Sequence, residues 1–305
     1  MEKETAGDPI SGLKWTRKTT AKVACELCRL GIEVSRSTVG RLLRKMGFCL
    51  RTNRKTVSCG STSDRDRQFR YLHRQRSQFE KRGDPVLSVD AKKRELIGNF
   101  NNPGVKWEPS ATVVNDHDFR TNATGIAIPY GVYDTQANRG SLFLGISHET
   151  SAFAVTCLHK WWQTEGRKRY PGSRHILILA DTGGSNGARR AAWKQELQRQ
   201  LCNGLGLTVT VAHYPSGASK WNPIEHRLFS QISRNWAAEP LYSYEKALKF
   251  IRTTTTATGL KVTARLDTRI YPTGVKVSKH HLAQLAIRPK RALPKWNYTI
   301  SPNVK

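Results

Sequence analysis

Three acidic side chains stand where their carboxylates could do chemistry together. Asp90 ends the apolar run PVLSVD, Asp181 ends the longer run HILILAD, and Glu225 lies in the first turn of a helix-like segment. Three carboxylates in one place repel each other unless a cation neutralises them, and hard divalent ions such as Mg²⁺ take oxygen ligands. Two such ions about 4 Å apart activate a water or a sugar hydroxyl and stabilise the leaving oxygen of a phosphodiester. These residues therefore predict a metal-dependent site for phosphodiester chemistry.

Each acid also has an interpretation without catalysis. Asp90 could cap a turn. Asp181 could belong to a nucleotide-binding turn, although the TGGSNG that follows it matches neither GxGxxG nor GxxxxGK[ST]. Glu225 comes three residues after Asn222, with Pro223 between them, which is the pattern of a helix N-cap with a capping-box acid. That role does not exclude metal binding, and the joint placement of the three acids favours a site.

The segments that must position these acids predict an α/β sheet layered with helices. Short apolar runs favour strands, and apolar residues three or four apart favour helices. We expect strands at 85–90, 126–134, 141–147, 175–181 and 207–215, with strand-like alternation in 91–100, and helices at 150–164, 188–201 and 219–236. Parallel strands bring their C-terminal residues to one edge of the sheet, where open α/β sheets carry their sites. The Glu225 helix can then pack across that edge.

The charge of the chain indicates a polyanionic partner. Its 305 residues carry 51 Lys and Arg against 23 Asp and Glu, a formal net charge of +28. Such an excess repels itself unless a polyanion neutralises it, so nucleic acid is the leading partner. No stretch approaches the roughly 20 apolar residues of a membrane span, which excludes a membrane protein. Six scattered cysteines form no dense disulfide framework, and this favours a reducing cytoplasm.

The basic charge is concentrated near the N-terminus, where the pattern is typical of a helix-turn-helix. One helix is expected over 20–30, and a second begins after Ser35 or Ser37, with apolar residues at Val39, Leu42, Leu43 and Met46. In that geometry the second helix enters the major groove and its basic residues contact phosphates. The DNA-binding residues expected there are Arg36, Ser37, Thr38, Arg41, Arg44 and Lys45. The bland alternative is a solvated basic helix.

This pattern divides the chain into a helix-turn-helix region at 1–57, a basic helical linker at 58–83 and a catalytic domain at 84–305. Cys25 and Cys28 form a CxxC inside the first helix. A zinc site would need a second pair nearby, and Cys49 and Cys59 are ten residues apart without a partnering His. We therefore expect Cys25 and Cys28 to be buried structural thiols.

Several long motifs closely resemble bacterial insertion-sequence transposases of the Rhodopirellula-type DDE family. They are LSVDAKKRELIGNF, PYGVYDTQANRG, LILADTGGSNGARRAAWKQELQ, SKWNPIEHRLFSQISRNW and WNYTI, and the similarity runs from about Asp8 to Ile300. The resemblance implies a ribonuclease H-like mixed sheet flanked by helices and preceded by a small all-α domain. It places the catalytic and metal-binding triad on Asp90, on Asp181 in ADTGGSNG and on Glu225 in NPIEHRLFS.

The same resemblance implies a mechanism and partners. A DDE transposase uses Mg²⁺, for which Mn²⁺ substitutes, with two ions per site. It hydrolyses DNA at the transposon end, and the freed 3′-hydroxyl then attacks target DNA. The partner is double-stranded DNA, both transposon ends and target, and a homo-oligomer is expected to bridge two ends. The implied location is the bacterial cytoplasm, on nucleoid DNA.

Residues beside the acids could contact the substrate. Lys92 and Lys93 could grip phosphates, or could be exposed strand lysines. Lys220 and Trp221 could contact and stack on a displaced strand, or Trp221 could fill the core beneath the helix. His226 could orient a carboxylate or contact a phosphate, although a surface histidine is the plainer interpretation.

Two departures from the family bear on this assignment. Relatives carry additional sequence before the region that matches Trp15, so the DNA-binding region is expected to be incomplete at its N-terminus. The residues just before WNYTI are also altered. Two rival functions remain: a structure-selective nuclease with the same fold, and a truncated DNA-binding relative without catalysis.

Overall fold

The computed structural model describes residues 6–7, 14–15, 18–50 and 63–303. The chain divides into two compact units, Met1–Cys59 and Gly60–Lys305. Within the described ranges, no helix is both long enough and apolar enough to cross a membrane.

The smaller unit contains the two expected helices, α1 (Thr20–Arg29) and α2 (Arg36–Lys45), and a two-stranded antiparallel sheet of β1 (Ala6–Gly7) and β2 (Lys14–Trp15). Thr19 caps α1, and Ser35, rather than Ser37, caps α2 by accepting a hydrogen bond from the Thr38 backbone N–H at 3.1 Å. Gly31 and Gly47 follow the helices with φ of +79° and +83°, the left-handed conformation that ends a helix. The predicted helices are therefore present, and their role in DNA binding stays a prediction.

The expectation of buried thiols at Cys25 and Cys28 is wrong, because both side chains are exposed. The buried residue of α1 is Val23. At about 100° per residue, Cys25 and Cys28 lie roughly 200° and 140° around the helix from Val23, away from its covered side. In α2 the expected apolar row is covered only at its start, since Val39 is buried and Met46 is 70% exposed.

The larger unit is built on a nine-stranded mixed sheet in the order β10-β11-β8-β7-β3-β5-β6-β9, with β4 paired to β5. β3 is parallel to β7 and β7 to β8, whereas β5 is antiparallel to both β3 and β6. This central arrangement is ribonuclease H-like, which confirms the predicted class of the larger unit. The expectation that the preceding small domain is all-α is wrong, because β1 and β2 pair in it. The strands are β3 (Val86–Ala91), β4 (Glu95–Ile97), β5 (Gly125–Asp134), β6 (Arg139–Gly145), β7 (His175–Ala180), β8 (Thr208–His213), β9 (Lys261–Asp267), β10 (Ile287–Pro289) and β11 (Asn297–Ile300).

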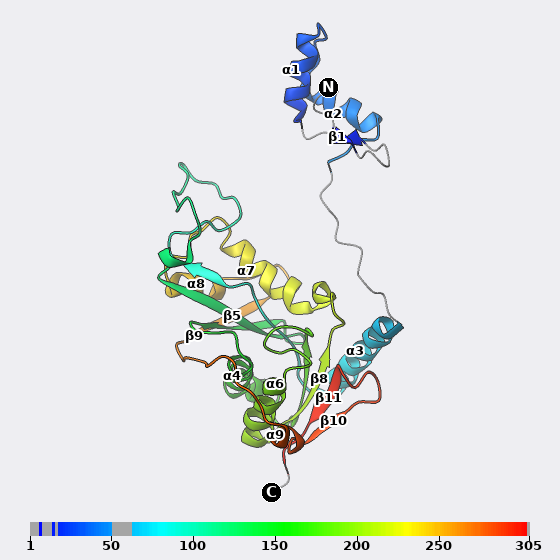
Figure 1. The fold of residues 1–305 in the computed structure, drawn as a ribbon, viewed down its shortest axis with the longest axis vertical. Coiled ribbons are helices and arrows are strands. Elements are labelled where there is room, and N and C mark those ends of the chain that lie inside the picture. Colours follow the sequence, from blue (N-terminus) through cyan, green and yellow to red (C-terminus); the bar gives the residue numbers. More distant parts are fainter. Residues whose placement is uncertain (1–5, 8–13, 16–17, 51–62, 304–305) are drawn as a thin grey trace. The chain divides into compact units, whose positions relative to one another are not determined.

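Helices cover both faces of the sheet, with α4 and α6 on one side and α7 and α8 on the other (Figure 1). The helices are α3 (Ser63–Arg82), α4 (Ser151–Trp161), α5 (Arg167–Arg169), α6 (Ala191–Glu196), α7 (Ser230–Asn235), α8 (Tyr244–Arg252) and α9 (Lys279–Ala283). Short 3₁₀ or π segments are η2 (Arg120–Asn122), η3 (Trp162–Gly166), η4 (Leu197–Asn203), η5 (Ser219–Trp221) and η6 (Glu225–Phe229).

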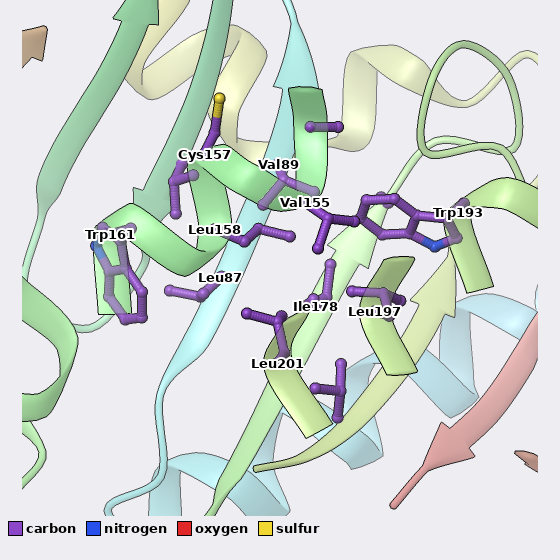
Figure 2. Close-up of a cluster of buried hydrophobic side chains, with 14 of the residues drawn as sticks. Leu87, Val89, Val155, Cys157, Leu158, Trp161, Ile178, Trp193, Leu197 and Leu201 are labelled. Atoms are coloured by element: carbon purple, nitrogen blue, oxygen red, sulfur yellow. The ribbon is translucent and has the colours of Figure 1, made fainter. Parts of the chain in front are cut away.

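On the first face, alternate residues of β3 and β7 pack against α4, α6 and η4. Figure 2 shows Leu87 and Val89 of β3 facing side chains of α4, with Trp193 of α6 beside them. Trp193 is fully buried and its indole N–H donates to the Tyr298 hydroxyl at 3.0 Å. Because side chains alternate along a strand, the residues between Leu87 and Val89 must point to the opposite face.

On the second face, α3 packs against β3, β7 and β8, while η6, α7 and α8 cover β5, β6 and β9. The segment predicted as a basic linker is thus a helix of the larger unit, with Tyr71, Leu72 and Phe79 buried against the sheet. Gly131 of β5 allows η6 to sit close, because a Cβ there would lie 2.7 Å from Ile224. This close packing fixes the beginning of η6, which carries Glu225, on the face that holds Asp90.

Candidate active site

Asp90 and Asp181 lie side by side at one edge of the sheet. β3 and β7 are parallel and Val89 pairs with Ala180, so the next residue of each strand reaches the same level. Asp90 shares its face with Val86, and Asp181 shares its face with Leu177 and Leu179 beneath α3. Both carboxyl groups are half-buried. The strand pattern in the sequence therefore predicted their shared edge correctly.

A buried polar bridge joins the beginning of the Glu225 segment to both strands. The Ser88 hydroxyl donates to the Asn222 side-chain oxygen at 2.5 Å and accepts from the Ile224 backbone N–H at 3.0 Å. The Asn222 side-chain amide donates to the Asp181 carboxylate at 3.3 Å. Ser88 and Asn222 are fully buried. The helix begins at Pro223, so Asn222 stands at the predicted N-cap position. Its side chain bonds Ser88 and Asp181, and no bond from it to a helix N–H is present among the described residues.

The three acids form one electrostatic cluster. Burial is the largest cause that raises the pKa of Asp90 to about 8, and the charge of Asp181 is the next. The charges of Glu225 and Glu149 raise this pKa further, whereas the hydrogen bond from the Ala91 N–H lowers it. The pKa of Glu225 is also raised, first by burial and then by Asp181. Burial raises the pKa of Asp181, which the hydrogen bond from Asn222 opposes. The carboxyl groups are therefore close enough to disfavour one another's ionised form.

The cations nearest this cluster do not pair with it: the charges of His226 and Lys92 lower the pKa of Glu225 without an ion-pair contact among the described residues. None of its acids forms an ion pair there. Lys92, only two residues after Asp90, instead pairs with Glu95 at 2.5 Å and lies over the Trp236 ring at 4.6 Å. Unneutralised carboxylates are the donor set that a hard divalent cation prefers.

The chemistry of these donors fits a divalent ion, while their positions do not yet form a complete coordination sphere. Among the described residues, no three His, Cys, Asp or Glu side chains are close enough together to hold a metal ion as they stand. The structure therefore brings Asp90, Asp181 and Glu225 to one edge and couples their charges, and it does not itself define a metal geometry.

Glu149 is an acid of this edge that sequence reasoning missed. It follows β6, which runs parallel to β3 and so ends at the same edge, and its carboxylate accepts from the Ser185 backbone N–H at 3.2 Å. Its charge contributes to the raised pKa of Asp90. The available signal was an acid placed between a strand and the Thr150 helix cap.

His213 is a second residue that the sequence did not single out. Its ring is fully buried, and Nδ1 donates to the backbone carbonyl of Asp181 at 2.8 Å. Burial lowers the pKa of His213 to about 4, assisted by the nearby charge of Lys194. A neutral imidazole therefore anchors the backbone that carries the second acid.

The other predicted contacts are distributed around this edge. Trp221 is 56% exposed, so the interpretation that it fills the core is wrong. Its ring meets Phe69 of α3 edge-on at 6.0 Å, and the Lys220 ammonium lies 5.3 Å from its centre. His226 is exposed and its ring contacts the Lys220 carbonyl, and Lys93 is exposed as well.

The predicted DNA-binding residues of the smaller unit lie on α2. Five of them are exposed: Arg36, Ser37, Arg41, Arg44 and Lys45. Thr38 is half-buried, and its hydroxyl lies 3.0 Å from the Ser35 hydroxyl. Thr38 therefore supports the helix cap, while the basic residues are free to meet a ligand.

Comparisons with known proteins identify relatives. The family model described as "Rhodopirellula transposase DDE domain" matches residues 1–302. Solved structures with a similar fold include the Mos1 transposase paired-end complex with left transposon end, at 18% identity and a TM-score of 0.45, covering 77% of this chain. The Mos1 strand transfer complex matches at 17% identity and 0.45, covering 80% of this chain and 72% of that one. This chain spans 65% of the length of the first of these. No match is found among curated proteins.

Proposed function

Because this chain belongs to the family of the Rhodopirellula transposase DDE domain, we propose that it is a DNA transposase of an insertion sequence. It cuts DNA at the ends of the element and joins those ends to target DNA. The observation that supports this proposal is the cluster of Asp90, Asp181 and Glu225, which has no ion-pair partner in the described chain although the protein carries 51 Lys and Arg. Carboxyl groups gathered without an ion-pair partner in so basic a protein are suited to a cation and its phosphate ligand.

In this proposal the three acids hold Mg²⁺, or Mn²⁺ in its place, with two ions per site. When bound, the ions activate a water or a 3′-hydroxyl and stabilise the leaving oxygen. Asp90 is the central member, because both other acids act on its pKa. Asn222 and His213 hold the side chain and the backbone of Asp181 in place.

Basic and aromatic residues around the edge orient the DNA. Lys93 and Lys220 supply positive charge, and exposed Trp221 offers a ring on which a base of a displaced strand can stack. The Lys92 ammonium pairs with Glu95 and lies over the Trp236 ring. It therefore contacts phosphates only through the N–H groups that do not point to Glu95. The basic side chains of α2 contact transposon-end duplex in the major groove. The assembly on DNA is a homo-oligomer that bridges two ends, in the bacterial cytoplasm.

The proposal is tested with Asp181→Asn and DNA that carries the ends of the element. We expect Mg²⁺-dependent nicking to be abolished while duplex binding, measured by fluorescence anisotropy, stays nearly unchanged. Asp116→Asn, at a carboxyl that is 92% exposed, is the matched control and should cleave normally. Undiminished cleavage by Asp181→Asn would remove the triad assignment.

The same reaction separates the transposase from its rivals. Wild-type protein should produce joined products as well as nicked ends when target DNA is added. Nicks without joining would identify a nuclease, and binding without any metal-dependent turnover would identify a DNA-binding relative.

A further inference from the structure

A groove of about 570 Å³ lies beside the C-terminal half of α3, where β7 and β8 begin, whereas the acid cluster lies where β3 and β7 end. Its walls are the C-terminal half of α3, the beginnings of β7 and β8, and the β10–β11 hairpin. None of the residues that line it is acidic, and its polar side chains are guanidinium, ammonium, imidazole, amide and hydroxyl groups. It belongs wholly to the larger unit.

The positive charge of this groove is largely unneutralised. Arg288, Lys290 and Arg291 line it, and none of them forms an ion pair with an acid of the described chain. The Arg288 guanidinium donates to the Ser301 hydroxyl at 3.3 Å, its one side-chain hydrogen bond to the described residues. Arg82 differs, because it pairs with Asp84 at 2.9 Å and lies over the Phe79 ring, and so it has a structural role.

We propose that this groove binds the sugar-phosphate backbone of the same DNA duplex that the acid cluster cleaves. The inference rests on the proposed function, since it takes DNA as the substrate. Charge argues for this occupant. A second copy of this chain, with its net charge of +28, is not complementary in charge to a basic groove. The chain's own segment 51–62 is not complementary either, because it contains Arg51, Arg54 and Lys55 and no acid. A phosphate backbone is complementary to it.

The length of α3 places the groove within reach of that duplex. Phe69 meets Trp221 beside the acid cluster, and Phe79 lines the groove. Ten residues along a helix span about 15 Å. At about 3.4 Å per nucleotide along one strand, this is roughly four or five phosphates from the cleaved bond, well inside one turn of duplex. A single duplex can therefore contact both places.

The test measures the salt dependence of binding to a fluorescein-labelled duplex of arbitrary sequence, about three helical turns long, with the full chain and no divalent ions. The variant R288Q/K290Q/R291Q removes three charges from the groove. Each phosphate contact contributes about 0.9 to the log–log slope, so the slope should fall by about 2 to 3. The control K249Q/K261Q/R265Q removes three exposed charges on α8 and β9, at the opposite end of the sheet, and its slope should fall by less than about 1.

The charge-conserving variant R288K/K290R/R291K should keep the wild-type slope, which separates lost charge from damage to the hairpin. Equal slopes for the groove variant and the control would overturn the inference while the proposed function stands. Absence of duplex binding by the wild type would overturn the proposed function itself. Binding of more than one duplex per chain, measured at saturating duplex, would show that the groove takes a separate DNA molecule and would refute the single-duplex arrangement.

Discussion

Asp90→Asn is expected to stabilise this protein at neutral pH when no divalent cation is present. Burial and the charge of Asp181 raise the pKa of Asp90 to about 8 in the folded protein, whereas an aspartate in an unfolded chain ionises near pH 4. Between these values the folded state keeps a proton that the unfolded state releases. The free energy of unfolding therefore falls as the pH rises through this window. Asparagine does not ionise, so the variant escapes this loss.

The size of the effect follows from the width of the window. One pH unit corresponds to about 1.4 kcal/mol, so the wild type loses about 4 kcal/mol relative to the variant between about pH 4 and pH 7. In a domain of this size that difference shifts the melting temperature by roughly 10 °C. The groups that act on this cluster are Asp181, Glu225 and Glu149, which raise the pKa of Asp90, and Lys92 and His226, which act on Glu225 in the opposite direction.

The assay is thermal unfolding with a chelator at several pH values for the wild type, Asp90→Asn and the exposed control Asp116→Asn. The advantage of Asp90→Asn should be small near pH 4 and grow toward pH 8. Millimolar Mg²⁺ should then raise the melting temperature of the wild type, because a ligand that binds only the folded state stabilises it, and should have little effect on Asp90→Asn. A difference that does not change with pH, or an equal response to Mg²⁺ in both proteins, would refute the reasoning.

Two further substitutions test how the acids are held. Asn222→Ala removes the acceptor of the Ser88 hydroxyl and the amide that donates to Asp181. It should lower the free energy of unfolding by about 1–3 kcal/mol. It should also weaken the binding of Mn²⁺, measured by electron paramagnetic resonance. Unchanged Mn²⁺ affinity would limit Asn222 to a role in stability. Gly131→Ala places a Cβ 2.7 Å from Ile224 and should cost about 1–3 kcal/mol in urea unfolding. Gly183→Ala, where a Cβ meets nothing within 4 Å, should stay within about 0.5 kcal/mol and serves as its control.

The sequence was sufficient for the strands that lead to Asp90 and Asp181, because Asp181 follows an uninterrupted apolar run and Asp90 follows an apolar run broken only by Ser88. It also located the Glu225 segment, since an apolar row with a period near 3.6 follows that acid. The strands β9, β10 and β11, near the two ends of the sheet, were not predicted. β10 and β11 have only three and four residues and are stabilised by pairing with distant strands. Glu149 was missed for the same reason: its place depends on the direction of β6 in the sheet, which no local pattern specifies.

The polar bridge beneath the site could not be predicted either, because it depends on contacts between residues 134 or more positions apart in the chain. Ser88 alternates with core residues and has the pattern of an ordinary strand serine. Asn222 takes the N-cap position that its pattern predicts, while its side chain bonds Ser88 and Asp181. The exposure of Trp221 could not be predicted either, because the sequence is compatible with a ring in the core and with a ring at the surface. These side chains acquire their roles only when η6 docks on the sheet.

Asp90, Asp181 and Glu225 form no ion pair within the described residues, and this leaves their carboxyl oxygens available to a metal ion. A basic side chain stands two residues from Asp90, yet Lys92 is held by Glu95 and Trp236. If a lysine neutralised the cluster, the apo protein would be more stable, but the carboxylates would then be occupied by an ammonium group that must be displaced before a metal ion could bind. Because the acids form no ion pair within the described residues, their carboxyl oxygens stay available to a divalent ion, whose binding would stabilise the folded state and supply the positive charge that a cleaved phosphate requires.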